Sequence, residues 1–168
     1  MKNYAFIDAQ NLYYGMKSLG WKLDYKRFRV YLKEKYKVEV AYLFMGEIPE
    51  YSFIYSQMRK AGFVICFKEV IRSKQGEVKG NIDAELVLQA MIDYFKYQKA
   101  IIISSDGDFS CLVKYLYGQN KLEVVMSPYV GDCSILLRKA TKGKIVFLQK
   151  LKEKIEYIKI GKNEKAPQ

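Results

Sequence analysis

The chain has 168 residues, with 29 Lys and Arg against 18 Asp and Glu, a formal net charge of +11, and no His. This length predicts one domain, and hydrophobic residues make up 50% of the chain, which supplies a buried core. The missing imidazole excludes Ser-His-Asp triads, Cys-His pairs and His-ligated zinc centres. Acid-base chemistry must therefore come from carboxylates, Lys, Tyr or metal-bound water.

The cysteines, the N-terminus and the net charge indicate the cellular compartment of the protein and the class of its binding partner. The three cysteines form no Cys-x-x-Cys pair, which argues against a zinc ribbon or a disulfide framework and favours a reducing compartment. The apolar N-terminal run is too short for a signal peptide or a membrane span, so we expect a cytoplasmic protein with no membrane partner. The basic balance favours nucleic acid, because each Lys or Arg that neutralises a phosphate releases a counterion. A solvated Lys-rich surface would give the same charge.

Short apolar runs without alternation predict strands that are buried on both faces of a parallel sheet. These runs are Tyr4–Asp8, Val38–Met45, Phe63–Lys68, Ala100–Ser104, Leu122–Met126 and Lys144–Leu148. The segments between them have helical spacing, as in residues 28–36 and 86–95, and the first crossover is long enough for two helices with a break at Gly20-Trp21. The alternation predicts a doubly wound α/β fold.

Two segments depart from this alternation. Residues 71–81 carry turn residues and charge without periodicity, which predicts a loop. After Leu148, apolar residues at helical spacing continue as far as Ile158, until Gly161 stops them. We therefore expect a domain over residues 1–148 and a basic C-terminal helix with a polar tail over residues 149–168.

Carboxylates occur where the predicted strands end. Asp8 ends the first strand, Asp106 and Asp108 follow the fourth, and Asp83 opens a helix. Ligands of open α/β sheets lie beyond the carboxyl ends of strands where the strand order reverses, so Asp8 and Asp106 face each other if their strands are adjacent. Converging acids need a compensating charge, and a divalent cation such as Mg²⁺ supplies it. Each acid also has a structural interpretation, since Asp83 and Asp106 stand where Asp caps helices and Asp108 complements a helix dipole.

Rival motifs are absent or weak. The chain has no P-loop and no dinucleotide-binding fingerprint. Gln10 stands where an aspartyl-nucleophile phosphatase has its second Asp. Asp106-Gly107-Asp108 also matches the Asp-x-Asp of nucleotide-sugar transferases or topoisomerase-primase domains, but a lone tripeptide is weak evidence.

Three ordered motifs carry a resemblance to a known family: Phe6-Ile7-Asp8-Ala9-Gln10-Asn11, Lys79-Gly80-Asn81-Ile82-Asp83-Ala84-Glu85-Leu86 and Ser104-Ser105-Asp106-Gly107-Asp108-Phe109. Together they resemble the NYN domain family, in the LabA-like branch of PIN-like nucleases, over about residues 3–148. The resemblance implies a PIN-like three-layer α/β/α fold with a central, mainly parallel sheet, RNA cleavage, and a carboxylate pocket for Mg²⁺ or Mn²⁺. Carried over by position, the implied catalytic and metal-binding acids are Asp8, Asp83, Asp106 and Asp108.

The same resemblance, with the surrounding charge, gives the expected substrate-binding residues. They are Asn11, Ser104 and Ser105 as polar neighbours, Lys79 beside the scissile phosphate, and Arg72 and Lys74 along the RNA backbone. Ser105 replaces a Gly of the family pattern. Some of the 15 tyrosines, such as Tyr13, Tyr14 or Tyr129, could stack on unpaired bases, although most are expected in packing.

Two further acids stand near the motifs. Glu85 lies two positions after Asp83 on a predicted helix, so it points elsewhere and is expected to support the site indirectly or to lie on the surface. Asp132 follows the fifth strand near the pocket rim, but Gly-Asp before a helix is an ordinary capping start. Asp132 is therefore assigned no catalytic role.

The expected function is that of a metal-dependent endoribonuclease that hydrolyses RNA phosphodiester bonds through Asp carboxylates. Two alternatives remain open: a non-catalytic RNA-binding or regulatory scaffold on the same fold, and a small-nucleotide phosphohydrolase. RNA is favoured over DNA by the resemblance alone. The sequence determines neither the RNA target, nor the number of ions, nor whether the chain forms a homodimer.

Overall fold

The computed structural model describes residues 2–68, 71–72, 78–79 and 81–159 of the chain. Its centre is a six-stranded, fully parallel sheet with the order β3-β2-β1-β6-β7-β8. The strands are β1 (Asn3–Asp8), β2 (Val38–Gly46), β3 (Val64–Lys68), β6 (Ala100–Ile103), β7 (Leu122–Ser127) and β8 (Ile145–Phe147). All six predicted strands are therefore present.

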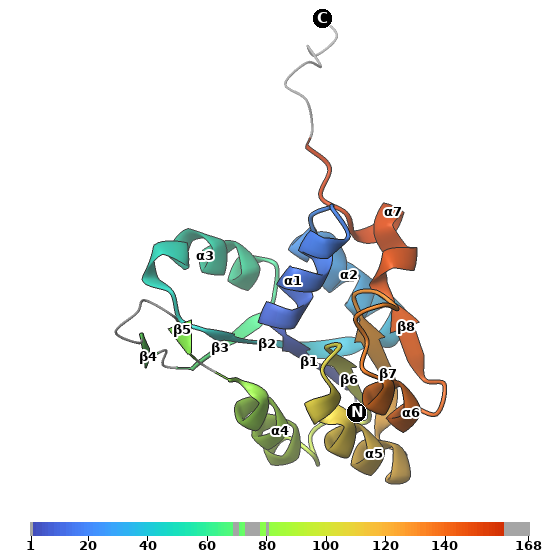
Figure 1. Ribbon diagram of the computed structural model, residues 1–168. Coiled ribbons are helices and arrows are strands. Elements are labelled where there is room, and N and C mark those ends of the chain that lie inside the picture. The colour runs from blue at the N-terminus through green and yellow to red at the C-terminus, as the bar shows by residue number, and fades with distance from the viewer. Residues whose placement is uncertain (1, 69–70, 73–77, 80, 160–168) are drawn as a thin grey trace, which may run out of the picture.

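Helices cover both faces of this sheet (Figure 1). One face carries α1 (Ala9–Ser18), α2 (Tyr25–Tyr36), α3 (Ser52–Lys60) and α7 (Lys152–Ile155), and the other carries α4 (Asp83–Ile92), α5 (Ser110–Gly118) and α6 (Ile135–Ala140). Short 3₁₀ turns complete the chain at η1 (Pro49–Tyr51), η2 (Gly107–Phe109) and η3 (Leu148–Leu151). The predicted three-layer α/β/α fold is confirmed.

The continuous apolar runs are explained by burial on both sheet faces. In β1, Ala5 and Ile7 pack under α1 and α2, whereas Phe6 packs on the opposite side with Leu86 of α4. Because successive side chains of a strand point to opposite faces, a strand covered on both sides needs apolar residues at every position. The two helices predicted in the first crossover are present, and Gly20, with φ of +74°, turns the chain between them.

Three sequence expectations were wrong in detail. The segment expected to be a loop contains a short antiparallel hairpin, in which β4 (Ile71–Arg72) pairs with β5 (Val78–Lys79). The helix expected to reach Phe95 ends at Ile92, because the chain turns at Asp93, whose buried carboxylate accepts hydrogen bonds from Gln89 and Lys96. Phe95 lies beyond that turn and is 85% exposed.

The C-terminal helix is also shorter than its apolar spacing predicts. It ends at Ile155, which is buried, and Glu156 is extended and forms a bridge with Leu23. The N–H of Tyr157 then donates to the carbonyl of Lys22, so backbone pairing replaces the next helical turn. Ile158 is consequently exposed. None of the helices in the described ranges is both long and apolar enough to cross a bilayer.

Candidate functional site

The site lies where the strand order of the sheet reverses. From β1 the chain moves to β2 and β3 on one side, and β6, β7 and β8 lie on the other side. Ile7 of β1 pairs with Ile103 of β6, so Asp8 and Ser104 leave the sheet next to each other. This is the adjacency that the sequence analysis required for Asp8 and Asp106, and it creates a crevice at the carboxyl ends of the strands.

A pocket of about 680 Å³ occupies this crevice. It is lined by Asp8, Gln10, Asn11, Tyr14, Gly15, Ser18, Asn81, Ile82, Asp83, Ser105, Asp106, Gly107, Asp108, Asp132 and Ser134. Five of these residues are aspartates, and within the described part of the chain no Lys or Arg lines the pocket. The pocket of this basic protein is therefore acidic.

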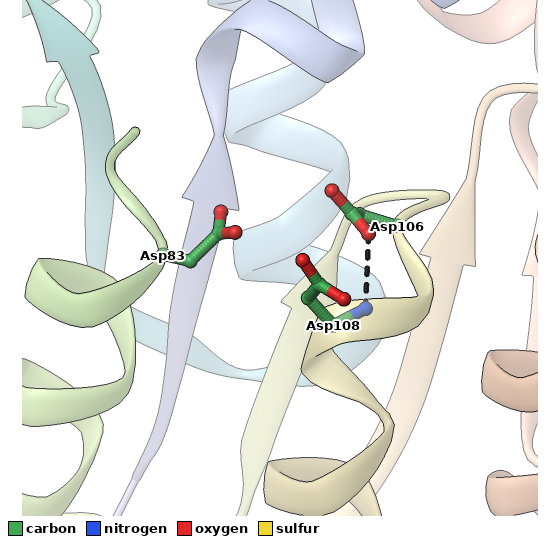
Figure 2. Close-up of side chains that lie close together, drawn as sticks. All are labelled: Asp83, Asp106 and Asp108. Atoms are coloured by element: carbon green, nitrogen blue, oxygen red, sulfur yellow. Dashed lines mark hydrogen bonds between the residues drawn. The ribbon is translucent and has the colours of Figure 1, made fainter. Parts of the chain in front are cut away.

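Three of the predicted acids converge closely in this pocket (Figure 2). Asp83 is the first residue of α4, while Asp106 and Asp108 come from the turn after β6 and point toward it from the opposite side. One carboxylate oxygen from each lies within 4.8 Å of the other two. Asp106 also caps η2, because its Oδ1 accepts a hydrogen bond of 2.9 Å from the N–H of Asp108. Capping uses one oxygen of Asp106 and leaves the other available to a ligand.

Asp8 lines the same pocket but lies outside that close group. It is only 6% exposed, and both of its oxygens are engaged: Oδ1 caps α1 by accepting from the N–H of Asn11 at 3.0 Å, and Oδ2 accepts from the Ser104 hydroxyl at 3.2 Å. Burial raises the pKa of Asp8 from 3.8 to about 6; the two hydrogen bonds oppose this rise, and the nearby charges of Asp83 and Asp106 add to it. Asp8 thus caps α1 and also places a carboxylate at the pocket wall whose ionised form is disfavoured by burial.

The polar neighbours hold the acid-bearing turn in place. The Ser104 hydroxyl accepts from the N–H of Asp106 at 3.1 Å while donating to Asp8, so it links two acids although it is fully buried and does not line the pocket. Asn11 Oδ1 accepts from the N–H of Ser105 at 2.8 Å, which ties α1 to the same turn. Ser105 stands where the pattern that the sequence resembles has Gly, and its hydroxyl pairs with that of Ser127 at 2.8 Å.

The remaining sequence candidates do not line the pocket in the described part of the chain. Glu85 forms an ion pair of 3.0 Å with Lys68, whose hydrogen bond holds the pKa of Glu85 below its ordinary value. Glu85 is not one of the three converging acids, although its charge adds to the rise in the pKa of Asp83. The backbone places Arg72 in β4 and Lys79 in β5. Lys74 lies outside the described residues.

Other pocket residues gave weaker sequence signals. Asp132 does line the pocket, and its position shortly after β7, the next strand along this sheet edge, is the signal that placed it near the rim. Gln10, Asn81 and Ser134 were not singled out as pocket residues by the sequence analysis. Gln10 and Asn81 stand inside two of the quoted motifs, which is the signal that could have found them, whereas only the observed path of the chain brings Ser134 into the crevice.

The electrostatics of the pocket favour a cation. Burial raises the pKa of Asp83, and the neighbouring charges of Asp106 and Asp108 raise it further. Carboxylates so close together repel one another unless a positive charge compensates them. The donor set is all oxygen, which suits hard divalent ions such as Mg²⁺ and Mn²⁺. The residues therefore fit a divalent metal site.

Comparisons with known proteins agree with this geometry. The family model described as NYN domain matches residues 4–149. LabA of Synechococcus elongatus, described as "Low amplitude and bright protein", is 24% identical over 132 residues, which cover 73% of this chain and 71% of LabA. The crystal structure of a protein of unknown function from Vibrio parahaemolyticus superposes with a TM-score of 0.70 at 24% identity, covering 88% of this chain and 92% of that one, which supports the fold.

The family match spans nearly all of the sheet and every acid of the pocket, and the LabA relationship points to one branch within the family. The chain belongs to the NYN domain family of PIN-like proteins, in its LabA-like branch.

Proposed function

We propose that this protein is a Mg²⁺- or Mn²⁺-dependent endoribonuclease that hydrolyses RNA phosphodiester bonds in the acidic pocket. The observation that carries the proposal is the convergence of Asp83, Asp106 and Asp108 from two separate segments to within 4.8 Å. The family match supports the nuclease class, and RNA is the substrate that this family favours. The net charge of +11 is consistent with a polyanionic substrate.

Each acid has a distinct proposed role. Asp83, Asp106 and Asp108 would hold the ion, and Asp8 would supply a fourth negative charge from the buried wall of the pocket. When bound, a divalent cation polarises a phosphoryl oxygen and supplies hydroxide near neutral pH, which is the chemistry that a chain without His needs. Ser104 and Asn11 position the acids through the hydrogen bonds described above, and they explain why the turn after β6 keeps its shape.

Contacts with the RNA backbone must come largely from outside the pocket. The described pocket lining holds no cationic side chain, so phosphates on either side of the scissile bond need partners at the rim. We propose Lys79, Arg72 and Lys74 for this role, because the hairpin of β4 and β5 immediately precedes Asn81 and Asp83. We also propose that residues 1–148 form the NYN domain and that residues 149–168 are a basic C-terminal helix with a polar tail, whose Ile155 packs into the core of the domain.

The test is cleavage of a labelled single-stranded RNA with Mg²⁺ or Mn²⁺, beside EDTA and the Asp106→Asn protein. The matched control is Asp24→Asn, since Asp24 caps α2 through a 3.0 Å hydrogen bond much as Asp106 caps η2, but does not line the pocket. We expect metal-dependent cleavage that EDTA and Asp106→Asn abolish and that Asp24→Asn retains, because Asn is also a good cap.

Other outcomes would identify the alternatives. RNA binding without cleavage across several RNA forms and both metals would indicate the non-catalytic scaffold. Hydrolysis of mononucleotides, with only a shallow salt dependence of binding to a long oligonucleotide, would indicate the small-nucleotide phosphohydrolase. Undiminished cleavage by Asp106→Asn would refute the assignment of the site.

A further inference from the structure

Tyr14 of α1 is the single aromatic side chain among the described residues that line the acidic pocket. It shares one face of α1 with Asn11 and Ser18, because residues three or four apart on a helix lie above one another. The opposite face of α1 packs on the sheet through Leu12 and Met16. The helix therefore places an aromatic ring one turn beyond the Asn11 amide that holds the acid-bearing turn.

The Tyr14 side chain is accessible at this position. The residue is 55% exposed, although it stands beside a pocket whose other lining residues are mainly small or polar. Tyr13 packs against it with ring centroids 5.3 Å apart and an interplanar angle of 70°, an edge-to-face contact that restricts the ring without covering it. What distinguishes Tyr14 from the other exposed aromatic residues is its place in the lining of the pocket, where its ring is open to a ligand held at the acids.

The charge of the pocket indicates what this ring would contact. Five aspartates repel the phosphates of a nucleic acid, and no cationic side chain among the described lining residues offsets them. A strand held at the acids thus gains little from its phosphates except through a bound cation, and an uncharged contact with a base would supply binding that the acidic wall does not oppose. Every base has a π-face that stacks on an aromatic ring, independent of sequence.

We propose that Tyr14 stacks on an unpaired base adjacent to the scissile phosphate, so that the pocket selects single-stranded RNA; this inference rests on the proposed ribonuclease function. In a duplex each base is already stacked on its neighbours, and presenting one to Tyr14 requires unstacking and unpairing it. We therefore expect the Tyr14 ring to recognise single strands with little discrimination among the bases.

The first experiment measures stacking without turnover. A single-stranded RNA carries 2-aminopurine at successive positions, and its fluorescence is followed on binding to the Asp106→Asn protein with and without Tyr14→Ala, Tyr14→Phe or Tyr117→Ala. Tyr117 is the matched control, because it is 40% exposed on α5 and does not line the pocket. We expect quenching at one position, lost in Tyr14→Ala and kept in Tyr14→Phe and Tyr117→Ala.

The second experiment measures cleavage of the same RNA with single abasic positions. Alanine substitution of a stacking residue weakens binding by about 5- to 150-fold per base, so Tyr14→Ala should raise KM about tenfold or more, while kcat changes little. The abasic position that raises KM for the wild type should have no further effect on Tyr14→Ala. Equal KM values for wild type and Tyr14→Ala, or the same quenching profile in both, would overturn the stacking proposal.

The two proposals fail in different ways. Absence of metal-dependent cleavage in the wild type overturns the ribonuclease function, while the fluorescence profile still decides whether Tyr14 stacks on a base. Metal-dependent cleavage that is indifferent to Tyr14→Ala and to every abasic position leaves the nuclease standing and overturns the role of Tyr14.

Discussion

Asp8→Asn should stabilise the metal-free protein at neutral pH while impairing the proposed site. Asp8 is 6% exposed, and burial raises its pKa to about 6. The amide can keep the cap on Asn11, because Asn is as good an N-cap as Asp. Its NH₂ can donate to the Ser104 hydroxyl oxygen, which then accepts from both this amide and the N–H of Asp106, while the Ser104 proton loses the carboxylate as its acceptor.

The magnitude follows from the pKa. One pKa unit corresponds to about 1.4 kcal/mol, so the rise from 3.8 to about 6 means that ionised Asp8 costs the folded state about 3 kcal/mol above pH 7. The sign is that of a raised pKa: the stability that Asp8 contributes is complete below its unfolded value of 3.8 and is lost as pH rises through about 6. Asp8→Asn removes this loss, and we expect a gain of about 1 to 3 kcal/mol at pH 7.5 that shrinks by roughly half at pH 5.

The assay is urea unfolding of the wild type and Asp8→Asn in EDTA at pH 7.5 and pH 5, with Asp24→Asn as the control. Asp24 also caps a helix through its Oδ1, so its substitution reports any general effect of replacing a capping Asp by Asn. A variant less stable than the wild type at pH 7.5, or a stability difference that does not change with pH, would refute the reasoning.

Two further predictions concern the packing and the hydrogen bonding that shape the site. A Cβ at Gly15 would overlap the ring of Pro128, whereas one at Gly118, at the end of α5, would meet nothing within 4 Å. In urea unfolding, Gly15→Ala should lower the free energy of unfolding by about 1 to 3 kcal/mol, and Gly118→Ala should raise it by about 0.4 to 1 kcal/mol. Equal effects of the two substitutions would contradict the close packing of α1 on Pro128. Asn11→Ala removes the acceptor of the buried Ser105 N–H, which should cost about 1 to 3 kcal/mol and weaken Mn²⁺ binding in calorimetry; unchanged stability and Mn²⁺ affinity would show that the Ser105 N–H does not depend on Asn11.

The sheet was predictable because its strands are buried on both faces. A run such as Ile101, Ile102 and Ile103 has no polar position, and all three side chains are fully buried against helices on alternating faces. The adjacency of β1 and β6 does not follow from the strand pattern, since strand order depends on contacts far apart in the sequence. Only the folded structure shows that Asp8 and Asp106 line the same pocket.

Local patterns failed where tertiary contacts override them. Ile158 continues the helical spacing of Leu151 and Ile155, yet pairing of Glu156 with Leu23 makes the chain extended. Spacing along the sequence also did not predict how the acids group. Both oxygens of Asp8 accept hydrogen bonds, from Asn11 and Ser104, and Asp8 lies outside the close group of Asp83, Asp106 and Asp108. A motif reveals which acids are available, whereas hydrogen bonds decide which of them face one another.

Sulfur substitution at the scissile phosphate tests the central claim most directly. Single-turnover cleavage is measured for RNA in which one non-bridging oxygen at the cleavage site is replaced by sulfur, in Mg²⁺ and in Mn²⁺. Because sulfur is a soft ligand that Mg²⁺ binds poorly and Mn²⁺ binds better, we expect slower cleavage of one stereoisomer in Mg²⁺ and recovery of the rate in Mn²⁺. An equal loss with both metals, or cleavage that persists in EDTA, would contradict a metal-dependent site formed by Asp83, Asp106 and Asp108.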